Sequence, residues 1–313
     1  MTVLFAANDG GHLAQLWALA PRLGPASQGR VWFTGETEQS RDLLKEERVI
    51  WARRAPSRNL TDALQNFRSL GEVWNQYSFT AAVSTGSSIA VSALTQAAAR
   101  RTRAVYIESA TRVDGPSLSG RLLAAVPGVE LYTQSGAWTS RRWSYVGSVF
   151  DGFRALPALS TPRPSLRVFV SLGTSSKYTF RRLLDRLVQI VPAEWTVECQ
   201  VGSTDCQGIP FACYPHLPYS EMRRQVNSAD IVVAHAGTGI ALAAIEAGRC
   251  PVLVPREGQE HVDDHQRQLA QDLKSRELVL VSDVDSLSLA TLMEAQQRRI
   301  EKTGEHPLRV RVW

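Results

Sequence analysis

Short apolar runs alternate with amphipathic stretches along most of the chain, and many of the runs end in glycine, serine, asparagine or aspartate. Apolar runs bounded by turn residues are typical of strands that are buried on both faces of a parallel sheet. The stretches between them carry apolar residues at helical spacing, as at Leu13, Leu16, Trp17, Ala20 and Leu23. The alternation predicts an α/β fold in which strands are followed by helices that cover the sheet.

Both halves of the chain show this pattern, and a proline-containing segment without periodicity separates them. We therefore predict two Rossmann-like α/β domains, over residues 1–150 and 166–285, with residues 151–165 as a linker and 286–313 as a C-terminal helix and tail. The C-terminal helix, predicted over residues 287–301, is expected to return to the first domain.

The stretch 229–272 has the most informative pattern, because a buried strand leads there through a glycine-bearing turn into a helix. Gly237 and Gly239 allow a sharp turn that brings N–H groups to the positive end of the helix. Such a helix N-terminus is an anion site suited to a diphosphate. The polar loop after the next strand offers carboxylates, amides and imidazoles, which suit sugar hydroxyls. The stretch therefore predicts a nucleotide-sugar site.

Three strand ends of the first half converge on one edge of its predicted sheet and carry His12, Gly86-Ser87-Ser88 and Glu108. Ligands bind at this carboxyl edge in open α/β sheets. His12 is the first candidate for a general base, with Asp9 as its rival, because a neutral imidazole titrates in the useful range. Phosphate or hydroxyl binding and a helix-capping role remain open for His12. Glu108 would orient that imidazole, contact an acceptor, or pair with Arg112.

Composition and charge narrow the choice of partner. The chain has 313 residues, of which 44% are hydrophobic and 21% charged, and it contains no apolar run long enough to span a membrane. Residues 1–150 hold 16 lysines and arginines against 11 acidic residues, which accounts for the whole net charge of +5. The excess favours an anionic partner for the first half, such as a diphosphate lipid or a membrane surface, although an arginine-rich coding habit explains it equally well. Nucleic acid is not expected, because no basic cluster interleaves with aromatic residues.

The chain opens on an apolar strand without a basic leader, and its four cysteines include no Cys-x-x-Cys pair. Both features indicate a reducing cytoplasmic compartment. The first glycine turn lacks the third glycine and the following acidic residue of a dinucleotide site, which argues against NAD.

The ordered motifs resemble those of one known family. The second half carries His235-Ala236-Gly237, Glu246-Ala247-Gly248, Val254-Pro255-Arg256 and Glu260-His261-x-x-Asp264-His265-Gln266, which resemble the donor half of family 28 glycosyltransferases. The first half carries Gly10-Gly11-His12, the run 106–113 and the run 117–120, which resemble the acceptor-side subunit of two-subunit members. The chain looks like a single-chain fusion of the bacterial capsule and exopolysaccharide enzymes, kin of the dolichol-diphosphate N-acetylglucosaminyltransferase pair and of the transferase that forms lipid II.

The resemblance implies the GT-B fold, in which two Rossmann-like domains face each other across a cleft. It implies inverting transfer of a sugar from a UDP-sugar to a polyprenyl-diphosphate-linked saccharide, with no metal and no other cofactor. A peripheral location at the cytoplasmic face of the cell membrane follows from the same resemblance. Three other functions are also compatible: a soluble UDP-sugar-dependent transferase acting on a small natural product, a sugar-nucleotide epimerase, and a non-catalytic UDP-sugar-binding protein.

The resemblance also assigns binding residues. The nucleotide diphosphate falls to Gly173, Thr174, His235, Gly237, Thr238 and Gly239, and the sugar hydroxyls to Glu257, Asp264 and Gln266. Many relatives grip the ribose with a glutamate six residues after the glycine of His-Ala-Gly, where this chain has Ala243. Glu246 would replace that contact, or pair with Arg249 at the helix end.

On the acceptor side, the small-residue turns at two strand ends are expected to hold the diphosphate, with Arg112 and Arg121 near the lipid phosphates; the turn residues are Gly10, Gly11, Gly86, Ser87 and Ser88. Two ordinary tight turns and two solvated arginines are the alternative. His261 and His265 lie one helical turn apart beside Asp263 and Asp264, a spacing found in zinc sites. No metal is expected there, because known members of this architecture hold the diphosphate with backbone dipoles.

Overall fold

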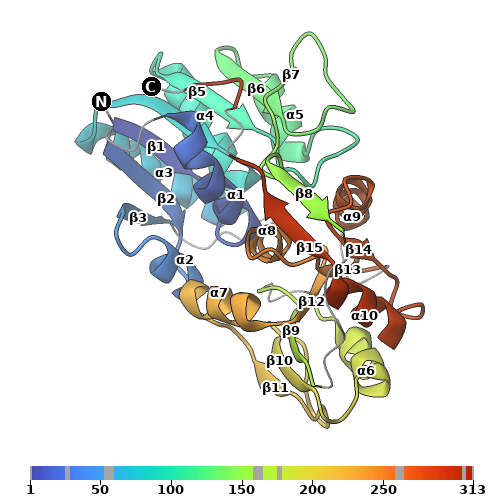
Figure 1. Cartoon of the computed structure of the whole chain (residues 1–313). Helices are drawn as coiled ribbons and strands as arrows, with labels where there is room; N and C mark the ends of the chain where they lie inside the picture. Colours follow the sequence, from blue (N-terminus) through green and yellow to red (C-terminus); the bar gives the residue numbers. More distant parts are fainter. Residues whose placement is uncertain are drawn as a thin grey trace. The chain divides into compact units, whose positions relative to one another are not determined.

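A computed structural model of the chain describes residues 2–24, 29–52, 60–157, 165–174, 178–257, 264–304 and 308–311, with side chains of the third range from residue 65. The chain forms two compact units, one comprising Met1–Asp151 with Glu305–Trp313 and the other comprising Gly152–Gly304. Each unit is built on its own parallel sheet (Figure 1). No helix in the described part of the chain is both long and apolar enough to cross a bilayer.

Within its described residues, the first unit has a seven-stranded parallel sheet in the order β3-β2-β1-β4-β5-β6-β7. Its strands are β1 (Thr2–Ala6), β2 (Gly29–Gly35), β3 (Arg48–Ala52), β4 (Phe79–Ser84), β5 (Arg103–Ile107), β6 (Val129–Thr133) and β7 (Ser144–Tyr145). Its helices are α1 (Gly11–Leu19), the 3-10 helix η1 (Ala20–Leu23), α2 (Glu38–Leu43), α3 (Leu60–Gln76), α4 (Ser87–Ala99) and α5 (Leu118–Ala124).

The central strands of this sheet are buried on both faces, as the apolar runs predict. Leu4, Ala6, Val31 and Phe33 lie in one core with residues of α4, and Trp32 stacks on Phe5 with their ring centroids 4.9 Å apart. β1 pairs directly with β4, so the turns that follow these two strands are neighbours at the carboxyl edge of the sheet. From β1 the chain continues to β2 and β3 on one side of the sheet and then returns to β4 on the other side of β1. The topological switch point, at which α/β sheets bind ligands, therefore lies between β1 and β4.

The second unit has a six-stranded parallel sheet in the order β11-β10-β9-β12-β13-β14, again within the described residues. Its parallel strands are β9 (Arg167–Ser171), β10 (Thr196–Gln200), β11 (Ala212–Tyr214), β12 (Ile231–His235), β13 (Val252–Val254) and β14 (Leu280–Val281). Its helices are α6 (Arg181–Ile190), α7 (Tyr219–Ser228), α8 (Thr238–Glu246), α9 (His265–Ser275) and α10 (Leu289–Gln297). β9 pairs with β12, which makes their following turns neighbours as well.

The second unit differs from the sequence prediction at both of its ends. β8 (Phe153–Leu156) lies in the segment predicted as a linker and pairs antiparallel with β15 (Arg299–Lys302), beside which it is drawn in Figure 1. β15 occupies residues for which the periodicity predicted the end of a helix, so that helix is shorter than expected. Residues 299–302 pair with β8 through their backbone groups, and they would lose this pairing if the helix continued through them.

The tail, rather than the C-terminal helix, returns to the first unit. α10 belongs to the second unit, whereas residues 305–313 are grouped with the first. Leu308 and Val310 are buried there, and the Arg309 amide donates to the Val146 carbonyl oxygen at 2.9 Å. The prediction that the C-terminal helix braces the first domain was therefore wrong, because alternating buried residues of an extended tail make that contact.

Candidate active site

The carboxyl edge of the first unit holds His12 in a fixed position. His12 is the second residue of α1, and its Nδ1 lies 2.9 Å from the Thr85 carbonyl oxygen, while the Thr85 hydroxyl donates to the His12 carbonyl oxygen at 2.7 Å. The backbone of Gly86 has a φ of +134°, and a Cβ at this position would lie 2.6 Å from the imidazole Cε1. Only glycine therefore fits beside the ring. Through these contacts, His12 holds the turn after β4 against the turn after β1.

This geometry determines which nitrogen of His12 is basic. A backbone carbonyl only accepts hydrogen bonds, so Nδ1 carries the proton and Nε2 carries the lone pair. Burial lowers the pKa of His12, the hydrogen bond to Thr85 opposes this shift in part, and the charges of Arg112 and Asp9 act in opposite directions. The imidazole is consequently neutral at pH 7, with Nε2 able to accept a proton.

The small residues predicted around the acceptor frame the same edge. Gly10 precedes α1 with a φ of +81°, and a Cβ on the exposed Gly11 would meet nothing within 4 Å. Ser87 begins α4 with a positive φ of 71°, which is unusual for a residue with a side chain. The buried Ser88 hydroxyl oxygen has no hydrogen-bond partner among the described residues. Two helix N-termini thus meet beside His12, an arrangement that favours an anion.

Glu108 has a different environment from the one predicted. It is completely buried, and its carboxylate accepts hydrogen bonds from the Tyr106 hydroxyl at 2.9 Å, the Ser109 amide at 3.0 Å, and the Ser117 amide and hydroxyl at 2.8 and 2.9 Å. Burial raises the pKa of Glu108, and these hydrogen bonds oppose the shift. A fully buried carboxylate with four donors does not fit a group that contacts an acceptor. We correct its role to holding the segment after β5.

Glu108→Gln is therefore expected to destabilise the first unit by about 2–4 kcal/mol, because an amide cannot accept from all of these donors and places an N–H group against one of them. Urea denaturation followed by circular dichroism measures this loss. The matched control is Glu130→Gln, which removes a partly exposed carboxylate paired with Arg103 at 2.7 Å and should cost less than about 1 kcal/mol. Equal losses for the two variants would contradict the role given to Glu108.

A buried amide network near His12 was missed by the sequence analysis. Gln15 is 1% exposed, and its amide donates to the Ser109 hydroxyl at 3.0 Å while its carbonyl accepts from the Ala110 amide at 2.9 Å and the Gln134 amide at 3.1 Å. Gln134 in turn donates to the Glu108 carbonyl oxygen at 3.0 Å. The network joins α1 to the segments after β5 and β6. The available signal was a glutamine between Leu13 and Leu16 on the face of α1 that packs inward.

Arg112 lies on the same segment, which its backbone helps to fix. Its amide donates to the Ser109 carbonyl oxygen at 2.9 Å, and its own carbonyl accepts from the Trp138 indole at 2.9 Å. Asp9 lies in the turn between β1 and α1. The predicted acceptor and base roles of Arg112 and Asp9 remain predictions.

The carboxyl edge of the second unit has a similar histidine–glycine arrangement. There the histidine comes from the later of the two neighbouring strands, whereas His12 follows the earlier one. His235 ends β12, and its Nδ1 lies 3.1 Å from the Ser171 carbonyl oxygen at the end of β9. Gly173 follows β9 with a φ of +84°, and a Cβ there would lie 2.9 Å from the imidazole. A Cβ on Gly237 would lie 2.3 Å from Nε2 of the same ring. Two glycines therefore enclose the His235 ring, which joins the two turns predicted to hold a diphosphate.

Thr238 supplies the chemical feature that fits an anion at this edge. It is the first residue of α8 and is 3% exposed, yet its hydroxyl oxygen has no hydrogen-bond partner among the described residues. A buried hydroxyl without a partner is rare in proteins and calls for an explanation. A phosphate oxygen at the N-terminus of α8 would accept from this hydroxyl and from the free N–H groups of the first turn. Thr174 and Gly239 lie on the same two turns.

Arg256 is a second residue that the sequence analysis missed, because a charged residue at the start of a polar loop reads as exposed. It is only 7% exposed. Its guanidinium donates to the carbonyl oxygens of Leu172 and Tyr178 and lies over the Phe180 ring, 5.4 Å from the centroid. The Arg256 amide donates to the Gln266 side-chain oxygen at 3.1 Å. Arg256 thus connects the turn after β9, the loop after β13 and the helix α9.

The carboxylates predicted to bind the donor have protein partners in this structure. Glu246 forms an ion pair with Arg223 of α7 at 2.7 Å, a partner that the sequence analysis did not consider. Glu257 is paired with Arg267 and lies 3.7 Å from Arg182, and Asp264 lies 3.5 Å from Arg267. To bind a sugar hydroxyl, each of these carboxylates would have to give up its ion pair with an arginine. Their roles in donor binding therefore remain predictions.

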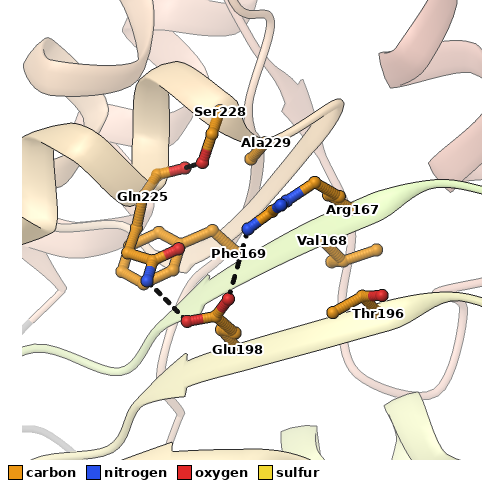
Figure 2. Close-up of a pocket in the computed structure, with 8 residues that line it drawn as sticks. All are labelled: Arg167, Val168, Phe169, Thr196, Glu198, Gln225, Ser228 and Ala229. Atoms are coloured by element: carbon orange, nitrogen blue, oxygen red, sulfur yellow. Dashed lines mark hydrogen bonds and ion pairs between the residues drawn. The ribbon is translucent and has the colours of Figure 1, made fainter.

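A small cavity lies at the opposite end of β9 and is unrelated to this edge (Figure 2). Its volume of about 10 Å³ holds no more than about one water molecule. The Glu198 carboxylate within it is engaged by Arg167 at 3.3 Å and by Gln225 at 2.5 Å. The cavity is lined by Arg167, Val168, Phe169, Thr196, Glu198, Gln225, Ser228 and Ala229. It is too small for a nucleotide.

The described residues include no group of three or more histidine, cysteine, aspartate or glutamate side chains arranged to hold a metal ion. His261 and Asp263, which belong to the histidine–aspartate pattern noted in the sequence, lie outside the described residues. The absence of a metal therefore stays a prediction.

Comparisons with known proteins give these observations a context. The glycosyltransferase family 28 C-terminal domain matches residues 185–305. The UDP-N-acetylglucosamine transferase subunit ALG13 of Yarrowia lipolytica is 28% identical over 88 residues, which make up 28% of this chain and 44% of that protein. The chain thus spans less than half the length of this curated relative.

Solved structures match nearly the whole chain. MurG from Acinetobacter baumannii has a TM-score of 0.57 at 16% identity and covers 94% of this chain and 89% of its own. SnogD from Streptomyces nogalater has a TM-score of 0.60 at 16% identity, with coverages of 95% and 92%. The spinosyn rhamnosyltransferase SpnG, complexed with thymidine diphosphate, has a TM-score of 0.58 at 11% identity, with coverages of 94% and 91%. At these identities the likeness concerns the fold, which is GT-B.

Proposed function

We propose that the protein is an inverting glycosyltransferase, because residues 185–305 match the glycosyltransferase family 28 C-terminal domain and the whole chain has the GT-B fold. It moves a sugar from a UDP-sugar to a saccharide carried on a polyprenyl diphosphate, in bacterial capsule or exopolysaccharide synthesis. The observation that carries the proposal is the pair of histidine–glycine clusters, one at the carboxyl edge of each unit, each beside a helix N-terminus.

The second unit binds the donor in this proposal. The diphosphate accepts hydrogen bonds from the N–H groups at the start of α8 and from the Thr238 hydroxyl, while Gly173 and Gly237 make room for the His235 ring that joins the two turns. These groups are already in place before the reaction. They stabilise the negative charge that develops on the departing UDP without reorganisation. The uridine specificity is supported by the name of the curated relative, which is a UDP-N-acetylglucosamine transferase subunit.

The first unit binds and activates the acceptor. Inverting transfer requires the acceptor hydroxyl to lose its proton as its oxygen attacks the anomeric carbon from the face opposite UDP. His12 Nε2 accepts this proton, and the Thr85 carbonyl then stabilises the resulting imidazolium through Nδ1–H. The N-termini of α1 and α4 lie beside His12 and suit the diphosphate of a lipid-linked acceptor. The positive charge excess of residues 1–150 supports the same assignment.

The proposed mechanism uses no metal. Backbone N–H groups and a helix dipole neutralise the leaving group in place of a divalent ion. Turnover is therefore expected to be unchanged when EDTA is added to an assay of the purified protein, because no step depends on a metal. Inhibition by EDTA that Mg²⁺ or Mn²⁺ reverses would contradict this mechanism.

A soluble glycosyltransferase that acts on a small natural product is the second candidate. The observation that favours it is the likeness of the whole chain to the kitacinnamycin glycotransferase and to the spinosyn rhamnosyltransferase. Both candidates share the donor edge and differ in the acceptor. The proposed peripheral location at the cytoplasmic face of the membrane belongs to the lipid acceptor alone.

One assay separates the two functions. The purified protein is incubated with radiolabelled UDP-sugars and short-chain polyprenyl-diphosphate saccharides, and lipid extracts are scored for labelled product. The proposal expects label in the lipid fraction for one UDP-sugar and none without the acceptor. Transfer only to water-soluble aglycones would select the second candidate. Conversion of a UDP-sugar without any acceptor would indicate an epimerase, and UDP binding without turnover would indicate a binding protein.

A further inference from the structure

Two side chains hold consecutive carbonyl oxygens of the turn that follows β9. His235 ends β12, and its Nδ1 lies 3.1 Å from the Ser171 carbonyl oxygen. Arg256 follows β13, and its guanidinium donates to the Leu172 carbonyl oxygen. β12 and β13 are the next two strands of the sheet after β9, so each of them supplies one of these side chains. The backbone of the turn is therefore fixed at two successive peptide groups.

The contact to Leu172 also fixes the amide of Gly173. The peptide bond between these two residues is trans and planar, so its C=O and its N–H point in opposite directions. Because Arg256 lies on the carbonyl side, the Gly173 N–H points away from it. The Leu172 N–H donates to the Gln200 carbonyl oxygen at 2.8 Å and so belongs to the sheet. The Gly173 N–H is thus the first amide beyond the sheet, and Arg256 holds its direction.

The guanidinium of Arg256 is itself held in place. Arg256 is only 7% exposed, and it also donates to the Tyr178 carbonyl oxygen at 3.4 Å, just before α6. Its guanidinium lies over the ring of Phe180, 5.4 Å from the centroid, where a cation is attracted to the aromatic face. Phe180 is completely buried, and its amide donates to the Thr204 hydroxyl at 3.1 Å. Arg256 therefore connects the start and the end of the segment between β9 and α6.

The positive charge of Arg256 affects the same peptide group. A cationic donor on a carbonyl oxygen polarises the peptide, which makes the N–H on its other side a stronger donor. The effect is larger in a buried site, where the effective dielectric constant is low. A stronger donor at Gly173 favours a negatively charged acceptor, such as a phosphate oxygen, over a neutral one.

We propose that Arg256 is a positioning residue for the nucleotide diphosphate, because it orients and polarises the peptide between Leu172 and Gly173. In this arrangement the Gly173 N–H donates to a phosphate oxygen, and Arg256 acts through the peptide without touching UDP. The inference rests on the proposed donor site and deepens it. A donor that is oriented before the reaction stabilises the charge of the departing UDP without reorganisation.

Binding of UDP and of uridine to the full-length protein tests the proposal, since uridine lacks the diphosphate. Arg256→Met removes the charge and the guanidinium donors, whereas Arg256→Lys keeps the charge without the planar fork. Arg256→Met should raise the Kd for UDP by about 10- to 100-fold, the range for losing a charge-assisted hydrogen bond. Arg256→Lys should raise it by about fivefold or more. The Kd for uridine should change by less than about twofold in both variants. Titration calorimetry measures UDP binding, and an NMR titration measures the weaker binding of uridine.

The matched control is Arg186→Met. Arg186 is a half-buried arginine of the same unit that also donates to a backbone carbonyl, that of Leu287 at 2.8 Å, and it should leave both affinities unchanged. A merely structural Arg256 would weaken UDP and uridine by the same factor, and that result would overturn the proposal. A wild-type Kd for UDP in Arg256→Met would overturn it as well. If circular dichroism shows that Arg256→Met does not fold, the ratio of the two Kd values in Arg256→Lys decides in the same way.

The same measurements separate this proposal from the proposed function. Wild-type protein that binds no UDP would refute both. UDP binding that depends on Arg256, in a protein that transfers no sugar, would refute the proposed function and leave the role of Arg256 standing. Sugar transfer by Arg256→Met with the kcat and KM of the wild type would refute the role of Arg256 and leave the proposed function standing.

Discussion

Replacing His12 by asparagine is expected to lower kcat by about 100-fold or more while leaving the affinity for UDP unchanged. An asparagine amide N–H can occupy the position of Nδ1 and keep the hydrogen bond to Thr85, so the variant removes the basic Nε2 without removing the contact that joins the two turns. UDP affinity is unaffected because the proposed nucleotide site lies in the second unit. Steady-state kinetics and isothermal titration calorimetry measure the two quantities.

The pH profile gives an independent check on His12. Burial lowers the pKa of the imidazole from its ordinary value of 6.5, so the neutral, proton-accepting form persists to lower pH than in an exposed histidine. The acidic limb of kcat/KM should consequently lie below pH 6.5 in the wild type and disappear in His12→Asn. Asp9→Asn is the matched comparison, since Asp9 is the rival base on the same turn. A large loss in Asp9→Asn with normal turnover in His12→Asn would transfer the role of base to Asp9.

Replacing Gly237 by valine is expected to raise the Kd for UDP by about 10- to 100-fold, which is the range for losing charge-assisted hydrogen bonds. Even the first side-chain carbon would lie 2.3 Å from Nε2 of His235, far closer than a contact permits. Either the imidazole or the turn must move, and both belong to the proposed diphosphate site. Titration calorimetry with UDP measures the change.

Gly136→Val is the matched control for this variant, because a Cβ at Gly136 would meet nothing within 4 Å and the residue has no positive φ. It should leave UDP affinity and turnover unchanged. A wild-type Kd in Gly237→Val would show that the turn before α8 does not hold the diphosphate.

The alternation of strands and helices was readable from the sequence because it depends on local periodicity. The strand ends that carry His12, Gly86 and His235 were placed correctly at the carboxyl edges, since parallel strands that follow one another through helices must end on the same side of a sheet. The end of α10 was not readable. Residues 299–302 leave the helix to pair with residues 153–156, and a partner so distant in sequence leaves no local signal.

Polar residues that act inside the protein were the main difficulty at the site. Glu108, Gln15 and Arg256 each have charged or amide side chains that a pattern of apolar and polar positions assigns to solvent. In the structure each is buried, because several backbone groups of neighbouring turns supply its hydrogen-bond partners. Those partners are brought together only by the folded sheet edge. The position of the turn that carries His12, by contrast, could be predicted from adjacent residues, because glycines directly after a buried strand mark such a turn.

The central claim is that the two units divide the work, with the nucleotide held by the second unit and the acceptor by the first. A crystal structure of the protein soaked in UDP tests this claim most directly. The account predicts that the diphosphate lies against Gly173, the Gly237 turn and the N-terminus of α8, within hydrogen-bond distance of the Thr238 hydroxyl. UDP bound beside Gly10 and Gly11 instead would contradict it.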